Sequence, residues 1–91
     1  MNDVEKYIEI ILRKAKEFEA RKIILFGSAL ENPEYCNDID LACDIPGLGM
    51  FLFASKLEEE LNKPVDVIPI NDKDPFMSIV NKYGRVIYDK G

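Results

Sequence analysis

The segment from Asp38 to Ile45 constrains the fold of this 91-residue chain most, because charged and apolar side chains alternate along it. Successive side chains of a β-strand point to opposite faces of its sheet, so this alternation predicts a strand with two unlike faces. The acidic face carries Asp38, Asp40 and Asp44, whereas the other face carries only apolar residues. Such a strand needs an apolar layer packed on one side, while its other side is free to hold an acidic site.

Hydrophobic periodicity elsewhere predicts helices that alternate with strands. Apolar residues recur at steps of three and four in three segments, which is the pattern of amphipathic helices packed on a core. Short apolar runs bounded by glycine, asparagine or proline predict further strands. These helices cover residues 3–19, 50–61 and 74–82, and these strands cover residues 23–26, 65–70 and 85–88. The order predicts a single α/β (α+β) domain over residues 1–91, with helices packed against a mixed β-sheet.

The composition excludes several kinds of chemistry. The chain has no histidine, so neither a histidine base nor a histidine metal ligand is available. Cys36 and Cys43 are seven residues apart, a spacing that fits no zinc or dithiol motif, and we expect free thiols outside any site. Of these two, Cys43 is expected in the core and Cys36 in a loop. Twelve Lys and Arg against seventeen Asp and Glu give a net charge of −5, which disfavours a stable duplex nucleic-acid partner.

Membrane association is also disfavoured by the sequence. The longest uncharged run, Ile45–Ser55, has eleven residues and is far shorter than a membrane-spanning helix. The first five residues, Met1–Glu5, are acidic and lack the basic and then apolar order of a signal peptide. We therefore expect a cytoplasmic protein.

The pair Asp38 and Asp40 is the first part of a candidate site. Residues i and i+2 of a strand point the same way, so the two carboxylates repel each other unless a cation binds between them. Magnesium prefers oxygen ligands and is usually held by one or two carboxylates together with substrate phosphates. The alternative is that both aspartates belong to the solvated face of an edge strand, as we expect for Asp44.

Gly27, Ser28 and Asp66 extend this candidate site. Gly27 permits a tight turn and a close approach to a ligand, and Ser28 offers a hydroxyl at an expected helix start, where free N–H groups attract phosphate. A turn with a helix cap is the alternative for this pair. Asp66 interrupts an apolar strand, which suggests a buried carboxylate that needs a cation rather than a solvated edge. Three carboxylates can hold two metal ions that assist attack of a hydroxyl on an α-phosphate, and Asp66 would help to deprotonate that hydroxyl.

The order and spacing of these residues resemble the DNA polymerase β-like nucleotidyltransferase family. The shared pattern is Gly27-Ser28, nine residues, Asp38-Ile39-Asp40, and later Asp66 in an apolar strand. It covers about residues 25–88, and the small prokaryotic members, the minimal nucleotidyltransferases, look most similar. The resemblance implies a nucleotidyltransferase fold and Mg²⁺-dependent transfer of AMP from ATP to a hydroxyl. It also implies that Gly27 and Ser28 bind phosphate and that the three catalytic metal ligands are Asp38, Asp40 and Asp66.

The same resemblance implies a partner protein. Minimal nucleotidyltransferases are often the antitoxins of HEPN-domain toxins, and some of them adenylylate a tyrosine of the toxin. The expected partners are therefore a nucleoside triphosphate and a HEPN-domain protein encoded nearby. A chain this small has no evident acceptor-binding domain, which favours a homo- or hetero-oligomer. The acceptor, the preferred base and the stoichiometry are not fixed by the sequence, and a small-molecule acceptor is a further alternative.

One departure from the family pattern leaves a second function open. The family commonly has an arginine soon after Gly-Ser, whereas this chain has Ala29-Leu30-Glu31, and Glu31 would repel a triphosphate. Either a partner or a residue such as Lys56 or Arg85 supplies positive charge, or the protein is a weak catalyst that neutralises its partner by direct occlusion. Phe51-Leu52 falls off the main apolar stripe of its helix, so it either packs under the preceding loop or forms an exposed patch for a partner.

Overall fold

One mixed sheet of four strands organises the computed structural model, which describes residues 3–32 and 34–90. The strands are β1 (Lys22–Phe26), β2 (Ile39–Asp44), β3 (Val65–Pro69) and β4 (Arg85–Asp89), and they lie in the order β3-β2-β1-β4. β1 pairs antiparallel with both β2 and β4, whereas β2 and β3 are parallel. β3 is thus an edge strand, and its last residue is Pro69, which has no N–H to donate.

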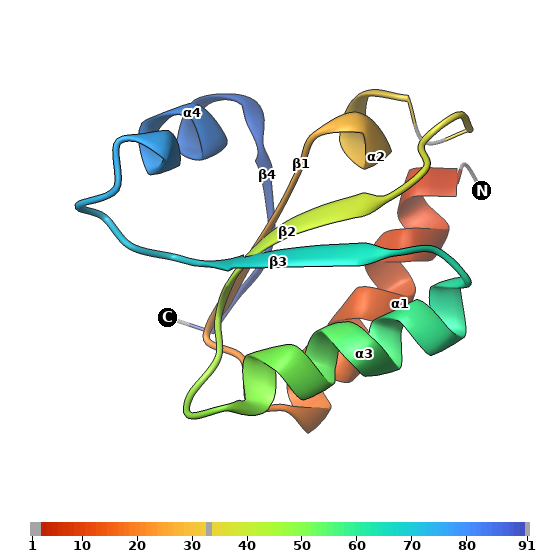
Figure 1. Ribbon diagram of the computed structural model, residues 1–91, viewed down its shortest axis with the longest axis horizontal. Helices are drawn as coiled ribbons and strands as arrows, with labels where there is room; N and C mark the ends of the chain where they lie inside the picture. Colours follow the sequence, from red (N-terminus) through yellow and green to blue (C-terminus); the bar gives the residue numbers. More distant parts are fainter. Residues whose placement is uncertain (1–2, 33, 91) are drawn as a thin grey trace.

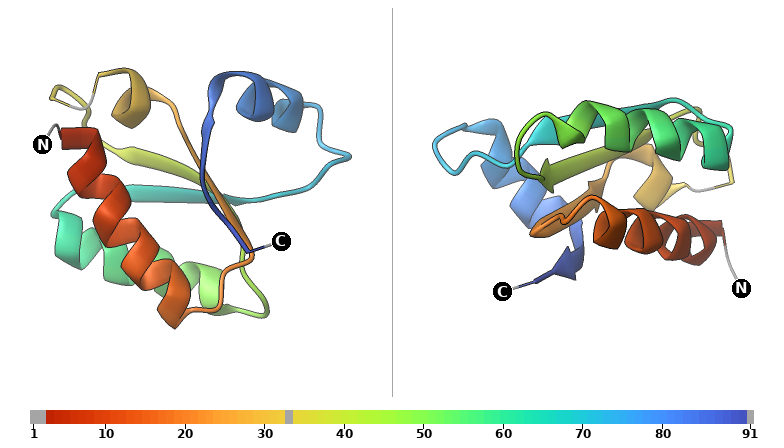
Figure 2. Two further views of the ribbon diagram at one scale, coloured as in Figure 1. Left: turned by 180° about the vertical axis from the view of Figure 1, so that it is seen from behind. Right: turned by 90° about the horizontal axis from the view of Figure 1, so that it is seen from below.

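Four helices surround this sheet and confirm the predicted α/β class. They are α1 (Asp3–Glu17), α2 (Ser28–Glu31), α3 (Gly49–Leu61) and α4 (Phe76–Tyr83). Figure 1 shows α1 and α3 together below the sheet, α4 above it, and α2 where β1 ends. The view from below in Figure 2 shows α1 and α3 side by side in front of the strands. Within the described part of the chain, no helix is long and apolar enough to cross a membrane.

Alternation along the central strands divides the apolar residues between two cores. Ile23 and Leu25 of β1 belong to the larger core with α1 and α3, whereas Ile24 between them belongs to the smaller core under α4. In β2, Ile39 and Leu41 face the larger core, so the residues between and after them face the α4 side. The buried residues of the smaller core are Ile24, Ala42, Met77 and Val80. The face that carries α4 therefore also carries the acidic residues of β2.

The first helix ends two residues earlier than predicted. Glu19 adopts a left-handed conformation with φ of 56°, which no α-helix tolerates. The N–H of Ala20 donates to the carbonyl of Ala15 at 2.9 Å, and the N–H of Glu19 donates to that of Lys16 at 3.3 Å. These two bonds form a Schellman motif, which stops the helix although the apolar periodicity continues to Phe18.

Both cysteines are buried thiols that form no disulfide. Cys43 lies in the larger core, as predicted, and burial raises the pKa of its thiol to about 12. Cys36 lies in the loop before β2, but its side chain is buried in the same core, with Sγ 3.9 Å from the hydroxyl of Tyr7. Cys36 is therefore a loop thiol, as predicted, and its side chain packs against α1.

Candidate metal centre

Three carboxylates converge where β2 and β3 begin. The parallel register places the Cα atoms of Asp40 and Asp66 opposite each other on neighbouring strands. Asp38 precedes the first residue of β2 and lies on the same side as Asp40, two residues further on. One carboxylate oxygen from each of the three residues lies within 4.8 Å of the others. The structure thus brings together the three aspartates that the sequence pattern singled out.

The three side chains differ in exposure, and Asp66 differs from expectation. Asp38 and Asp40 are half-buried, whereas Asp66 is exposed. The prediction of a buried Asp66 is wrong because β3 is an edge strand, so no further strand covers its open side. Asp66 is therefore assigned to the cluster because its carboxylate lies close to those of Asp38 and Asp40, and not because it is buried.

The cluster has an electrostatic cost without a cation. Burial raises the pKa of the Asp40 carboxyl above its usual range, and the negative charges of Asp38 and Asp66 raise it further. Within residues 3–32 and 34–90, no lysine or arginine forms an ion pair with any of the three. A divalent cation would neutralise the repulsion among the three carboxylates.

The ligand chemistry and spacing fit magnesium. Magnesium binds oxygen at about 2.1 Å, so two ligands on opposite sides of one ion are about 4.2 Å apart. Paired catalytic ions lie about 3.5–4 Å from each other. Oxygens separated by up to 4.8 Å suit either arrangement with small side-chain rotations. The donor set consists of carboxylates alone, which favours a hard ion over zinc.

Gly27 brings the backbone against this cluster. Its φ of 76° and ψ of −156° lie in a region that essentially only glycine occupies. A Cβ atom at this position would meet Oδ2 of Asp40 at 2.5 Å. Ser28 follows as the exposed first residue of α2, where the first N–H groups have no acceptor within the helix. The Gly27-Ser28 turn therefore offers N–H groups and a hydroxyl beside the carboxylates.

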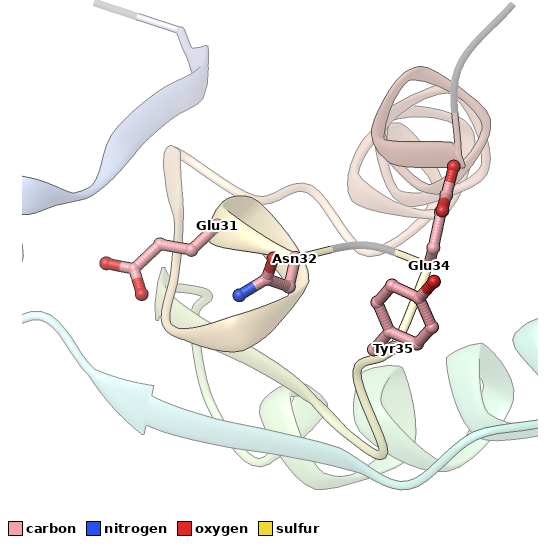
Figure 3. A pocket seen from close by; sticks show the side chains of 4 residues that line it. All are labelled: Glu31, Asn32, Glu34 and Tyr35. Atoms are coloured by element: carbon pink, nitrogen blue, oxygen red, sulfur yellow. The ribbon is translucent and has the colours of Figure 1, made fainter.

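The segment after Ser28 offers no positive charge in place of the arginine that the family commonly has. Ala29 is fully buried in the larger core. Glu31 ends α2 and lines a shallow pocket of about 150 Å³ together with Asn32, Glu34 and Tyr35. Figure 3 shows the Glu31 side chain directed away from Glu34 and Tyr35. Two carboxylates make this pocket unsuitable for a triphosphate, so it is not the nucleotide site.

The two basic residues suggested as substitutes for the arginine lie elsewhere. Lys56 pairs with Glu59 at 3.7 Å on α3, which packs on the face opposite the carboxylates. Arg85 pairs with Glu5 of α1 at 3.1 Å, so its guanidinium also faces the α1 side. In the structure both basic groups thus pair with glutamates and not with the three aspartates.

Lys63 is a residue near the site that the sequence did not identify. Its ammonium donates to the backbone carbonyl of Cys36 at 2.9 Å, and the N–H of Ile39 donates to the carbonyl of Pro64 at 2.9 Å. These bonds join the segment that leads to Asp38 with the segment that leads to Asp66. The two residues are 27 positions apart, and no pattern in the sequence predicts that they are in contact.

Solved structures with the same fold include several toxin–antitoxin complexes. A chain of a toxin–antitoxin structure with AMP-PNP has a TM-score of 0.75 and 21% identity, over 90% of this chain and 73% of that one. A chain of the toxin–antitoxin MntA-HepT has a TM-score of 0.71 and 18% identity, over 93% and 72%. A chain of the tri-AMPylated Shewanella oneidensis HEPN toxin in complex with MNT antitoxin has a TM-score of 0.70 and 18% identity, over 94% and 72%. At such identities these likenesses establish a shared fold.

The family follows from a second comparison. A search of curated proteins gave no significant match. The family model described as Polymerase beta, Nucleotidyltransferase, in contrast, matches residues 5–91, which is nearly the whole chain. This match confirms the resemblance seen in the spacing of Gly27-Ser28 and the three aspartates. The chain belongs to the polymerase β-like nucleotidyltransferase family.

Proposed function

We propose that this protein is a Mg²⁺-dependent nucleotidyltransferase that transfers AMP from ATP to a hydroxyl of a partner protein. The convergence of three carboxylates within 4.8 Å beside a glycine turn carries this proposal. Membership of the family supports the reaction class, and the neighbouring structure with AMP-PNP supports ATP as the donor.

Each site residue has a role in this proposal. Asp38 and Asp40 hold the metal ions, and Asp66 completes the ligand set from β3. Bound magnesium would neutralise charge on the triphosphate and polarise the α-phosphate. The N–H groups that follow Gly27 and the hydroxyl of Ser28 donate hydrogen bonds to the phosphate oxygens of the leaving group.

The reaction is an in-line displacement at the α-phosphorus. The acceptor oxygen forms a bond to the α-phosphorus, and the bond from that phosphorus to the bridging oxygen of the β-phosphate breaks, so pyrophosphate leaves. Asp66 accepts the proton of the acceptor hydroxyl. Its exposure on the edge strand suits this role, because an acceptor on a second protein can approach it from solvent.

A tyrosine of a HEPN-domain protein encoded nearby is the acceptor that we propose, with this chain as the antitoxin. The support is that structures with the same fold include a tri-AMPylated HEPN toxin in complex with MNT antitoxin. The chain offers the carboxylates and the glycine turn, while the partner would supply the acceptor surface in a hetero-oligomer. The partner would also supply the positive charge for the triphosphate that Lys56 and Arg85 do not provide.

Mass spectrometry tests this proposal. The chain is mixed with Mg-ATP and the HEPN-domain protein, and the partner is analysed for covalently added AMP. We expect the modification with the wild-type chain and its loss in the Asp38→Ala, Asp40→Ala double variant. Asp44→Ala is the matched control, since Asp44 lies on the same strand face but outside the carboxylate cluster. Modification that persists in the double variant would overturn the proposal.

A second function, neutralisation by contact, is favoured by one surface. Three large apolar side chains at the start of α3 are exposed: Leu48 by 85%, Phe51 by 69% and Leu52 by 54%. Such a patch is typical of a protein-binding surface. Of the two alternatives for Phe51-Leu52, packing under the preceding loop or exposure, the side chains are exposed. If contact alone neutralises the toxin, Phe51→Asp abolishes neutralisation without ATP, while the double aspartate variant stays effective. Ile79→Asp, at an exposed apolar position of α4, is the control.

A further inference from the structure

An aromatic pair adjoins the carboxylate cluster on the α4 side of the sheet. Phe26 is the last residue of β1, and its Cα atom pairs with that of Asp40 in the antiparallel register. Side chains directly opposite each other on antiparallel strands are immediate neighbours on one face. The rings of Phe26 and Phe76 meet edge to face, with centroids 6.0 Å apart and planes inclined by 72°. Phe26 thus connects the start of α4 with Asp40.

The first turn of α4 fixes the position of Phe76. Oδ1 of Asp74 accepts the N–H of Phe76 at 2.9 Å, and the carbonyl of Asp74 accepts the N–H of Met77 at 2.9 Å. Pro75, the N-cap residue of α4, has helical angles, φ −56° and ψ −30°. Although it contacts Phe26, the Phe76 side chain is 44% exposed. It presents an open aromatic surface on a turn that is already ordered.

The α4 side of the sheet changes from charged at Asp66 to apolar at Ile68 within the strand β3. Ile68 lies two residues after Asp66 in β3, so both side chains point to the α4 side. Ile68, Phe26 and Ile70 are partly buried against the smaller core. One face therefore has acidic groups that suit metal and phosphate at one end and an apolar aromatic surface at the other.

We infer that Phe76 stacks on the base of a nucleoside triphosphate whose phosphates lie at the carboxylate cluster. The inference rests on the proposed function and adds the group that contacts the base. A nucleoside triphosphate has the same polarity as this face, with a charged tail and a flat, apolar ring system. Stacking accepts every base because each has a π-face, and the larger purine rings stack more strongly. Phe76 therefore gives a preference for purines over pyrimidines without strict selection.

Calorimetric titration separates the base from the phosphates. The ligands are Mg-ATP, Mg-CTP and Mg-tripolyphosphate, and the proteins are wild type, Phe76→Ala and Tyr83→Ala. Tyr83 is the matched control, an aromatic residue 63% exposed at the other end of α4. We expect Phe76→Ala to weaken Mg-ATP binding about 5- to 100-fold, to weaken Mg-CTP binding less, and to leave tripolyphosphate binding unchanged. Tyr83→Ala should bind all three as wild type does.

A fluorescent variant reports base stacking directly, without removal of the aromatic side chain. The chain has no tryptophan, so Phe76→Trp introduces a single indole where stacking is expected. Mg-ATP should quench its emission while Mg-tripolyphosphate does not, and Tyr83→Trp should respond to neither. Equal affinity of the wild type for Mg-ATP and Mg-tripolyphosphate, or an unquenched Phe76→Trp that binds Mg-ATP, would overturn the inference alone. If the wild type binds neither ligand even with the HEPN-domain partner present to supply positive charge, the proposed function fails as well.

Discussion

Oδ2 of Asp40 lies 2.5 Å from the point where a Cβ atom on Gly27 would be. The glycine and the aspartate are thirteen residues apart in the sequence, but the end of β1 and the start of β2 bring them into contact. Because a Cβ atom at this position would displace the Asp40 carboxylate, Gly27 is required for the arrangement of the cluster as well as for its turn. The Gly-Ser and Asp-x-Asp motifs are thus parts of one packed unit.

Replacing this glycine should damage the site more than the fold. Gly27→Ala introduces a backbone strain of about 1–3 kcal/mol and displaces the Asp40 carboxylate. Gly47→Ala is the matched control, because Gly47 also has a positive φ, 66°, but nothing lies within 4 Å of the added atom. Urea unfolding should show both variants destabilised, while manganese binding should be lost only in Gly27→Ala. Manganese binding that survives in Gly27→Ala would contradict the packing described.

Removing the charge of Asp40 should stabilise the metal-free fold. The pKa of this carboxyl is raised by folding, so its favourable contribution is present below the ordinary value of 3.8 and is lost as the pH rises through the raised pKa. In EDTA at pH 7, Asp40→Asn should therefore have a higher free energy of unfolding than wild type. The difference should shrink near pH 3.5, where the carboxyl is largely protonated in the folded protein. An Asp40→Asn variant that is less stable than wild type at pH 7 would contradict this account.

Lys63 should strengthen metal binding although it does not contact the metal ligands. Lys63→Met removes the 2.9 Å hydrogen bond to the Cys36 carbonyl and so loosens the segments that carry Asp38 and Asp66. Loss of such an outer contact typically weakens metal binding about 10-fold or more. Lys56→Met, which breaks only an exposed ion pair on α3, should bind manganese as wild type does. Equal affinities of the two variants in a manganese titration would remove Lys63 from the site.

The thiols should be unreactive in the folded protein. Cys43 is buried with its pKa raised to about 12, so almost no thiolate exists at pH 8, and Cys36 is buried as well. A disulfide reagent such as DTNB should label neither cysteine in buffer and both in urea. Because burial raises the pKa of Cys43, the protonated thiol contributes fully to the stability of the folded state below its ordinary pKa of 9.0. This contribution declines as the pH rises from 9.0 toward about 12. Rapid labelling of the native protein would show that the core opens readily.

The candidate site residues were predictable because their signals are local. The alternation from Asp38 to Ile45 gives both the strand and its acidic face, and i, i+2 spacing puts Asp38 beside Asp40 whatever the sheet order. Asp66 was harder, since its position next to Asp40 depends on the parallel pairing of β2 with β3. The apolar neighbours of Asp66 suggested burial, which failed because an edge strand leaves one side open.

Features that depend on long-range contacts had no sequence signal. The order β3-β2-β1-β4 follows from which apolar faces pack together, and no single segment records it. The four residues of α2 are too few for a periodic pattern, although the helix start at Ser28 was expected. The contact of Phe26 with Phe76 joins residues fifty positions apart and became visible only with α4 placed on the sheet.

Manganese binding followed by electron paramagnetic resonance tests the central claim most directly, because the signal of free Mn²⁺ decreases as the ion is bound. Wild type, Asp40→Asn and the control Asp44→Asn are compared, with Mg²⁺ as a competitor. We expect wild type and Asp44→Asn to bind Mn²⁺ and to release it to Mg²⁺, and Asp40→Asn to leave the free signal unchanged. Binding by Asp40→Asn as tight as that of wild type would contradict the claim that these carboxylates form a metal centre.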